Sequence, residues 1–199
     1  MKKIYLALLA TAIFISLLLG MYWLHVTYLR VDVVLYSAIA DGILATVIAA
    51  SFLYIWRSFN IFNGFEKLQL AAIWFLGGYI FAISIPTVID RSLSFYILEK
   101  IQQRGGGIQL AKFEEVFTKE YVTEHRLVDV RLTEQQQSGT ITIQDGCVKL
   151  TARGAQLASF SRFFRKNLLP KQRLLMGNYT DALTDPFRNS QKVANYECQ

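Results

Sequence analysis

Three long apolar segments constrain this chain more than any other feature of its sequence. Residues Ile4–Leu24 and Leu68–Ile89 carry no formal charge, and Val33–Trp56 carries only Asp41. Each segment exceeds the roughly 20 residues needed to cross a hydrocarbon core of about 30 Å. Backbone amides find no water in that core, so an open segment of this length should be an α-helix. The sequence therefore predicts three transmembrane helices within residues 1–90.

The overall composition agrees with a membrane protein. Hydrophobic residues make up 53% of the chain and charged residues only 18%, which is too apolar for a disordered chain and unusual for a small soluble domain. The first segment differs from a cleaved secretory signal, because Met21-Tyr22-Trp23 stands where small residues would be needed. We therefore expect an uncleaved anchor and a multi-pass protein of a bacterial-type inner (plasma) membrane.

The charges that flank the three segments divide evenly between the two sides of the membrane. With a cytoplasmic N-terminus, the inner side holds Lys2, Lys3, Arg57 and Lys67, and the outer side holds Arg30, Arg91, Lys100 and Arg104. The lysine pair beside the first helix breaks the tie, since the first helix usually dominates insertion. We therefore expect the N-terminus in the cytoplasm and the C-terminal domain on the external side.

Asp41 lies near the middle of the second segment, where a carboxylate is costly unless it is neutral, paired or beside water. It could be a proton site, a contact to a polar substrate path, or a hydrogen-bonding anchor to another helix; the anchor suits a chain with only three spans. Small residues form a stripe beside it: Ala38, Gly42, Ala45 and Ala49. Because small residues let helix backbones approach closely, we expect a packing surface here, within the bundle or against another membrane protein.

The residues after the third segment are enough for one modest soluble domain, which we place at 91–169. The spacing of apolar residues predicts helices at 94–103, 110–121, 124–137 and 151–167. Asp145-Gly146, between two short alternating segments, predicts a β-hairpin with a two-residue loop. Residues 170–199 lack a long apolar face, so we expect an extended polar tail.

Several short motifs accompany the expected hairpin and the helices on either side of it. They are Arg126-Leu127, Gln137-Ser138-Gly139-Thr140-Ile141, Asp145-Gly146 and Lys149-Leu150-Thr151-Ala152-Arg153-Gly154. Together with the element order, these motifs resemble winged helix-turn-helix domains. The resemblance spans Phe95 to Phe164 and implies an all-α membrane part followed by a small α+β winged-helix-like domain. It does not fix a function, because one fold serves many functions.

In DNA-binding winged helices, the third helix enters the major groove and presents hydrogen-bond donors to DNA. Residues 114–134 of this chain instead hold six acidic side chains against three basic ones, and such a surface repels a polyanion. The possible DNA contacts are Arg126, Arg131 and the wing residue Lys149. We expect a winged helix used for protein contact, and we do not expect nucleic acid as a partner.

The expected fourth helix is amphipathic and basic. One side of it carries Leu157, Phe160, Phe163, Phe164 and Leu168. The basic residues that could meet a membrane surface are Arg162, Arg165, Lys166, Lys171 and Arg173. Two interpretations stay open: the helix lies on anionic lipid, or its phenylalanine side is the core of the domain.

The sequence offers few candidates for catalysis. His125 and Asp129 form the single histidine–carboxylate pair on one expected helix, and neither this pair nor Cys147 has a recognisable nucleophile or ligand companion. His25 is placed in the loop after the first helix, and no spacing fits a metal site. We expect no cofactor and no metal, and an enzyme that uses Asp41 or His125 on a lipid-linked substrate is the least favoured class.

These observations predict a non-enzymatic accessory or scaffold subunit of an inner-membrane assembly. Its expected partners are membrane lipids and another membrane protein, and its winged-helix-like domain would contact a protein or the membrane surface. Envelope polysaccharide or glycolipid biogenesis is the setting we consider. The alternative is a membrane-tethered winged-helix transcription regulator, which requires the C-terminal domain in the cytoplasm.

Overall fold

The computed structural model describes residues 2–188, and its internal contacts divide the chain between Tyr121 and Val122. This division falls inside the expected soluble domain at 91–169 rather than before it. The larger elements of the first unit are α1 (Lys2–Tyr28), α2 (Val34–Ile55), α3 (Gly64–Ser84), α4 (Pro86–Arg91) and α5 (Leu93–Gln103). Its shorter elements are 3₁₀ helices at Arg57–Ile61 and Leu110–Lys112, the single turn α6 (Phe113–Glu115) and a π-helix at Val116–Tyr121.

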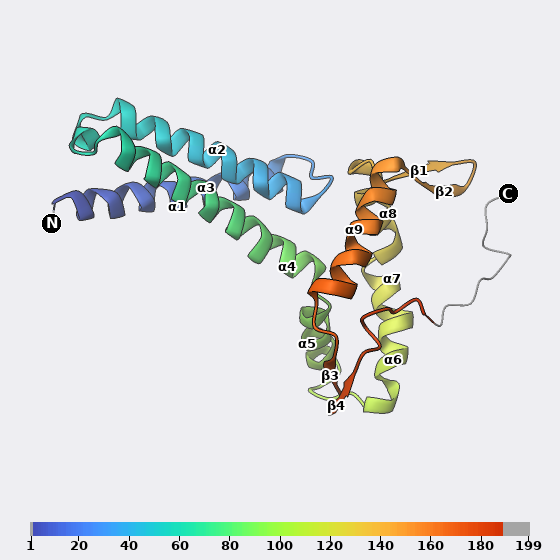
Figure 1. Cartoon of the computed structure of the whole chain (residues 1–199). Coiled ribbons are helices and arrows are strands. Elements are labelled where there is room, and N and C mark those ends of the chain that lie inside the picture. The colour runs from blue at the N-terminus through green and yellow to red at the C-terminus, as the bar shows by residue number, and fades with distance from the viewer. Residues whose placement is uncertain (1, 189–199) are drawn as a thin grey trace. The chain divides into compact units, whose positions relative to one another are not determined.

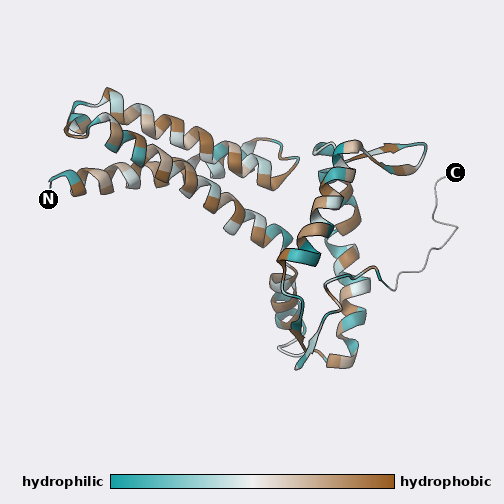
Figure 2. Cartoon of the chain, viewed as in Figure 1, coloured by the Kyte–Doolittle hydropathy of each residue, from teal (hydrophilic) through white to brown (hydrophobic). Residues whose placement is uncertain are grey.

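Three helical segments of the first unit are long and apolar enough to cross a membrane, as the sequence predicts. They are Lys2–Tyr28, Val34–Ile55 and Gly64–Arg91. The three segments lie side by side, and Figure 2 shows hydrophobic residues along each of them. The third segment is interrupted between α3 and α4, because Pro86 has no backbone N–H with which to continue the helix.

Aromatic and small side chains fill the centre of the three-helix bundle. The rings of Phe14 in α1 and Trp74 in α3 stack with centroids 5.6 Å apart, and the Trp74 indole N–H donates to the Thr11 hydroxyl over 3.1 Å. Ala45 and Ala49 of α2 are buried in the same cluster. Burying the polar edge of the indole is inexpensive here, because its N–H keeps a hydrogen-bond partner.

Charged residues tie two helices together at one end of the bundle. Asn63 begins α3 with a capping box, in which its side chain accepts from the Glu66 amide and the Glu66 carboxylate accepts from the Asn63 amide, both over 2.8 Å. The same carboxylate binds the Lys3 ammonium of α1 at 2.8 Å. The starts of α1 and α3 therefore lie at the same end of the bundle, as an up–down–up arrangement of three spans requires.

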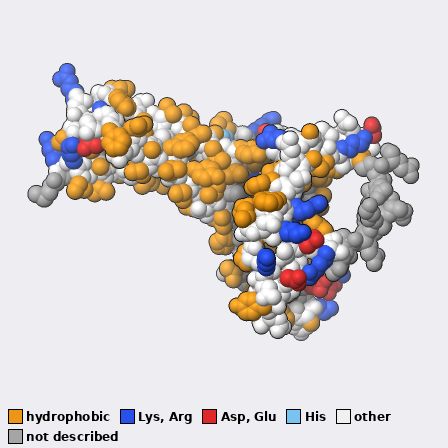
Figure 3. All heavy atoms as spheres, viewed as in Figure 1, with side chains coloured by type: hydrophobic (Ala, Val, Ile, Leu, Met, Phe, Trp, Pro, Cys, Tyr) orange, Lys and Arg blue, Asp and Glu red, His pale blue; other side chains and the backbone are white. Residues whose placement is uncertain are grey.

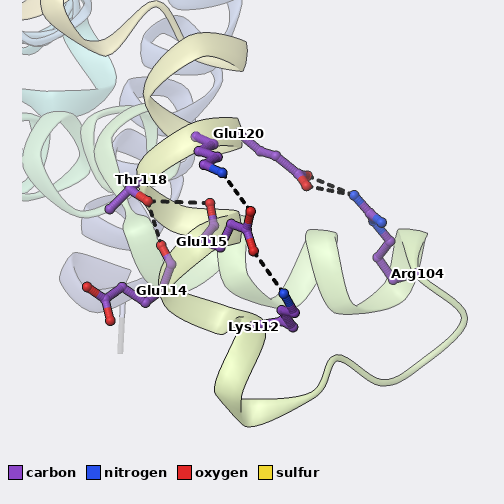
Figure 4. Close-up of polar contacts among 7 residues, drawn as sticks. Arg104, Lys112, Glu114, Glu115, Thr118 and Glu120 are labelled. Atoms are coloured by element: carbon purple, nitrogen blue, oxygen red, sulfur yellow. Dashed lines mark hydrogen bonds and ion pairs between the residues drawn. The ribbon is translucent and has the colours of Figure 1, made fainter.

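Hydrogen bonds and ion pairs hold the segment that follows the bundle. Ser92 caps α5 by accepting a hydrogen bond from the Phe95 amide. Glu120, in the π-helical turn, receives the buried Lys100 ammonium over 2.7 Å and the Arg104 guanidinium over 2.8 Å. Figure 4 shows Arg104 reaching from the end of α5 toward Glu120. The helix expected at 110–121 is present as an unbroken helical stretch of mixed 3₁₀, α and π geometry, and Glu120 ties this stretch to α5.

The second unit contains the expected helix, hairpin and helix, in that order. Its elements are α7 (Val122–Glu124), α8 (Leu127–Gln137), β1 (Ile141–Gln144), β2 (Cys147–Leu150), α9 (Ala152–Leu168), β3 (Arg173–Leu175) and β4 (Asn178–Thr180). β1 pairs antiparallel with β2, and Asp145 and Gly146 form the loop with positive φ at both positions. The structure does not confirm a winged helix, since its contacts divide the residues of the resemblance, 95–164, between two compact units.

A second hairpin follows α9, in the region where we expected an extended tail. β3 pairs antiparallel with β4 around Met176 and Gly177, and both turn residues have positive φ. The Thr184 hydroxyl donates to the Lys171 carbonyl over 2.9 Å, which holds the following chain beside the start of this hairpin. The last part of the expected tail, 189–199, lies outside the described residues.

Candidate functional site

A histidine–aspartate pair joins the first two helices of the bundle. His25 Nδ1, in the last turn of α1, lies 2.8 Å from Asp41 Oδ1 in α2. Asp41 is only 5% exposed, and its second oxygen, Oδ2, has no hydrogen-bond partner among residues 2–188. The Asp41 carboxylate orients the His25 imidazole within an apolar bundle. Such a pair can bind a hydrogen-bonding group or transfer a proton.

The loop position that we expected for His25 is wrong. α1 continues to Tyr28, and the Leu29 amide closes its last turn by donating to the His25 carbonyl over 2.9 Å. The apolar run ends at Leu24, but the helix persists because the aromatic and histidine side chains that follow are tolerated at a membrane interface. A sequence signal was available: α1 and α2 are antiparallel neighbours, so an ionisable residue near the end of one faces residues early in the other.

The small-residue stripe beside Asp41 lies inside the bundle. Ala38, Ala45 and Ala49 are almost fully buried, and Gly42 faces Gly78 of α3. A Cβ placed on Gly42 would lie 3.2 Å from the Gly78 backbone. The small-residue stripe of α2 is therefore covered by other helices of this chain. Other residues form the surface that another membrane protein could contact.

The apolar side of α9 is exposed, so it does not form a domain core. Phe160 is 58% exposed and Phe163 57% exposed, and large apolar side chains continue this side of the helix at Leu157, Phe164 and Leu168. Between residues 122 and 188 no hydrophobic side chain is buried. We refer to Leu157, Phe160, Phe163, Phe164 and Leu168 as the α9 apolar face. Thr151 begins the helix by accepting from the Gly154 amide over 3.1 Å.

Basic side chains accompany the α9 apolar face. Arg162 and Lys166 are exposed on α9, and Arg165 is partly exposed on the same helix. Of the two remaining basic candidates, Lys171 is exposed after the helix and Arg173 begins β3. Figure 3 shows hydrophobic patches next to Lys and Arg side chains on this unit. The helix is therefore amphipathic in space as well as in sequence, with its apolar side uncovered.

The residues considered for DNA contact are largely engaged by acids of their own helix. Arg126, which begins α8 in a left-handed conformation, binds Asp129 at 2.8 Å. Arg131 binds Glu134 at 2.9 Å, while Lys149 is exposed on β2. Pairing with carboxylates reduces the positive potential that phosphate recognition requires.

Neither a metal site nor a relative identifies the activity. In the described part of the chain, no group of three or more His, Cys, Asp or Glu side chains could hold a metal ion. Asp129, the carboxylate that we paired with His125 on the sequence, accepts a hydrogen bond from Arg126. Comparisons with known protein families, curated proteins and solved structures found no match to this chain. The His25–Asp41 pair and the α9 apolar face are therefore the two candidate functional features of the described chain.

Proposed function

We propose that this chain is a non-enzymatic accessory or scaffold subunit of an inner-membrane assembly, anchored by three helices and making contact through α9. The observation that carries the proposal is the α9 apolar face, exposed in a unit that buries no hydrophobic side chain between residues 122 and 188. Several large apolar side chains exposed side by side on one helix mark a site that binds a protein or a membrane. The α9 helix is therefore a contact surface.

The charges beside this face define what it contacts. By helical spacing, Arg162, Arg165 and Lys166 lie on the side of α9 away from the phenylalanines, and this amphipathic combination suits the headgroup layer of an anionic leaflet or an acidic surface of a membrane-bound partner. The β1–β2 hairpin between α8 and α9 adds further exposed surface that a protein partner could contact. We place the assembly in envelope polysaccharide or glycolipid biogenesis.

The alternative, a membrane-tethered transcription regulator, receives less support. Arg126 and Arg131 are both paired with carboxylates one turn away. A DNA-binding surface presents such side chains to phosphates instead. The pairing favours protein contact over DNA contact.

The proposal includes a cytoplasmic N-terminus and an external C-terminal unit, following the lysine pair Lys2 and Lys3. The test introduces Ser159→Cys on the exposed surface of α9 and treats intact cells with a membrane-impermeant thiol reagent. We expect labelling above the background of the unmodified chain. Labelling that requires permeabilised cells would reverse the topology and make DNA binding the next property to measure.

The contact role is tested by cross-linking the tagged full-length chain in its native membrane and purifying it in mild detergent. We expect a defined membrane-protein partner to co-purify, and Phe163→Asp to remove it. Val148→Asp is the matched control, because Val148 is 45% exposed but lies on β2, outside the α9 apolar face. A chain that purifies as a monomer without a partner, or equal capture by both variants, would refute the proposal.

A further inference from the structure

A cavity lies between α1 and α2, next to the loop that joins them. Its volume is about 480 Å³, within the usual range for small-molecule sites. Met21, Leu24 and Leu44 contribute apolar walls, and the polar side chains of the lining are His25, Asp41 and Tyr28. The site is therefore shaped for a molecule with a hydrocarbon portion and a small polar head.

The histidine–aspartate pair fixes the polar character of this cavity. His25 Nδ1 is engaged by Asp41 Oδ1 at 2.8 Å, so Nε2 is the ring nitrogen left for another molecule. Nε2 has no hydrogen-bond partner in the described chain, and the His25 side chain keeps 20% of its surface exposed. The carboxylate holds the ring in place from behind, as a buried aspartate does for many functional histidines.

The unsatisfied oxygen of Asp41 is an independent observation that points to a ligand. Asp41 is only 5% exposed, yet its Oδ2 atom has no hydrogen-bond donor among residues 2–188. A buried acceptor without a partner is destabilising, and bound polar molecules commonly satisfy such groups. The pair therefore has unused hydrogen-bonding capacity at the Nε2 of His25, whose side chain keeps exposed surface, and at Oδ2, which is enclosed by the protein.

We propose that this cavity binds a lipid alcohol, with its hydroxyl at the His25–Asp41 pair and its hydrocarbon chain along Met21, Leu24 and Leu44. A hydroxyl both donates and accepts, so it bonds to His25 Nε2 in either protonation state of the ring. An ammonium group only donates, and it is far more costly to bury in an apolar cavity than a hydroxyl. This binding site is independent of the proposed contact role of α9.

The experiment uses the full-length chain in lipid nanodiscs with a long-chain fatty alcohol that carries a photoactivatable diazirine in its chain. Irradiation should attach the probe to residues of 21–29 or 40–44, as read by peptide mass spectrometry. Unlabelled fatty alcohol should compete about tenfold better than the hydrocarbon that lacks the hydroxyl, the factor expected from one buried hydrogen bond.

Two variants separate the cavity from the polar pair. Leu44→Trp fills the cavity while keeping both His25 and Asp41 in the chain and should abolish labelling there, while Ile43→Trp, at a 45%-exposed neighbour outside the lining, should preserve it. His25→Phe replaces the imidazole with an apolar ring, and it should remove the competitive advantage of the alcohol over the hydrocarbon.

Three results would overturn the proposal. Equal competition by alcohol and hydrocarbon would identify a purely apolar groove. Competition by a fatty amine but not by the alcohol would identify a cation site instead. Unchanged labelling in Leu44→Trp would show that the probe binds elsewhere on the protein.

Discussion

The backbones of Gly42 in α2 and Gly78 in α3 touch: a Cβ built on Gly78 would lie 3.0 Å from the Gly42 Cα and 3.3 Å from its carbonyl oxygen. Both neighbours are backbone atoms of a packed helix, so neither can move aside cheaply. This contact sets the separation of the two helices. It also allows the small residues of α2 to be buried without leaving a cavity between the helices.

Gly78→Ala should therefore destabilise the bundle. Overpacking of this kind typically costs about 1–3 kcal/mol, and the measurement is unfolding of the full chain in mixed detergent micelles. Gly77→Ala is the matched control on the same helix, because its Cβ would meet only the Phe14 ring at 3.9 Å. Equal stabilities of the two variants would contradict the close contact of α2 and α3.

The His25–Asp41 pair predicts a pattern among three variants. His25→Leu leaves the Asp41 carboxylate without its partner in an apolar site and should lower stability by about 1–3 kcal/mol. Asp41→Leu should cost a comparable amount. The double variant, which removes both polar groups, should recover most of the loss. Additive losses in thermal unfolding of the detergent-solubilised chain would show that the two side chains do not interact.

Glu120 predicts a loss of stability in acid. The hydrogen bond from Lys100 is the main cause that holds the Glu120 pKa below its ordinary value of 4.5, and Arg104 lowers it further against the opposing effect of burial. A carboxyl whose pKa is lower in the folded state stabilises the fold above its unfolded pKa, and this contribution disappears as the pH falls through the folded pKa. The segment 93–121 should therefore loosen below about pH 4.5.

Hydrogen exchange of that segment in the full chain, followed from neutral to acidic pH, measures this effect. Glu120→Gln should exchange faster at neutral pH and show a weaker dependence on acid. Glu114→Gln, at an exposed glutamate of the neighbouring turn, is the control and should behave as the unmodified chain. A Glu120→Gln profile that retains the full acid dependence would assign the loosening to other groups.

The three spans were predictable because length and the absence of charge are sufficient for a membrane helix. The ends of the spans were not, since helix persistence past Leu24 depends on interfacial residues such as His25 and on the neighbouring helix. The stripe at Gly42 indicated close packing, but the sequence of one helix does not identify its partner. Gly78 became that partner only through the three-dimensional arrangement of α2 and α3.

In the second unit, too, a local feature was predictable from the sequence, whereas exposure and packing were not. The Asp145-Gly146 loop predicted the β1–β2 hairpin in its correct position, because a two-residue loop with positive φ at both residues is a local property. The exposure of Phe160 and Phe163 was left open by the sequence, since a phenylalanine stripe looks alike whether it faces a core or an external partner. The hairpin around Met176 and Gly177 lacked such a clear signal and was missed.

Gly154 ends a motif at the start of α9, and the packing of this glycine gives the motif a structural reason. In Leu150-Thr151-Ala152-Arg153-Gly154, the Thr151 hydroxyl caps α9, and the Thr151 amide donates to the Thr140 carbonyl over 3.1 Å. A Cβ on Gly154 would collide with that same carbonyl oxygen and with the Leu150 side chain. The first turn of α9 therefore packs directly on the backbone at the start of β1, and only glycine leaves enough room.

Gly154→Ala should separate α9 from the hairpin, with a cost of at least about 1–3 kcal/mol. The readout is hydrogen exchange of peptides covering residues 139–155 in the full chain, which should accelerate in this variant. Gly107→Ala is the control, because its Cβ would meet nothing within 4 Å, and its effect should stay within about 0.5 kcal/mol. Unchanged exchange in Gly154→Ala would mean that α9 is not seated on Thr140, and the position of the α9 apolar face relative to the hairpin would then need revision.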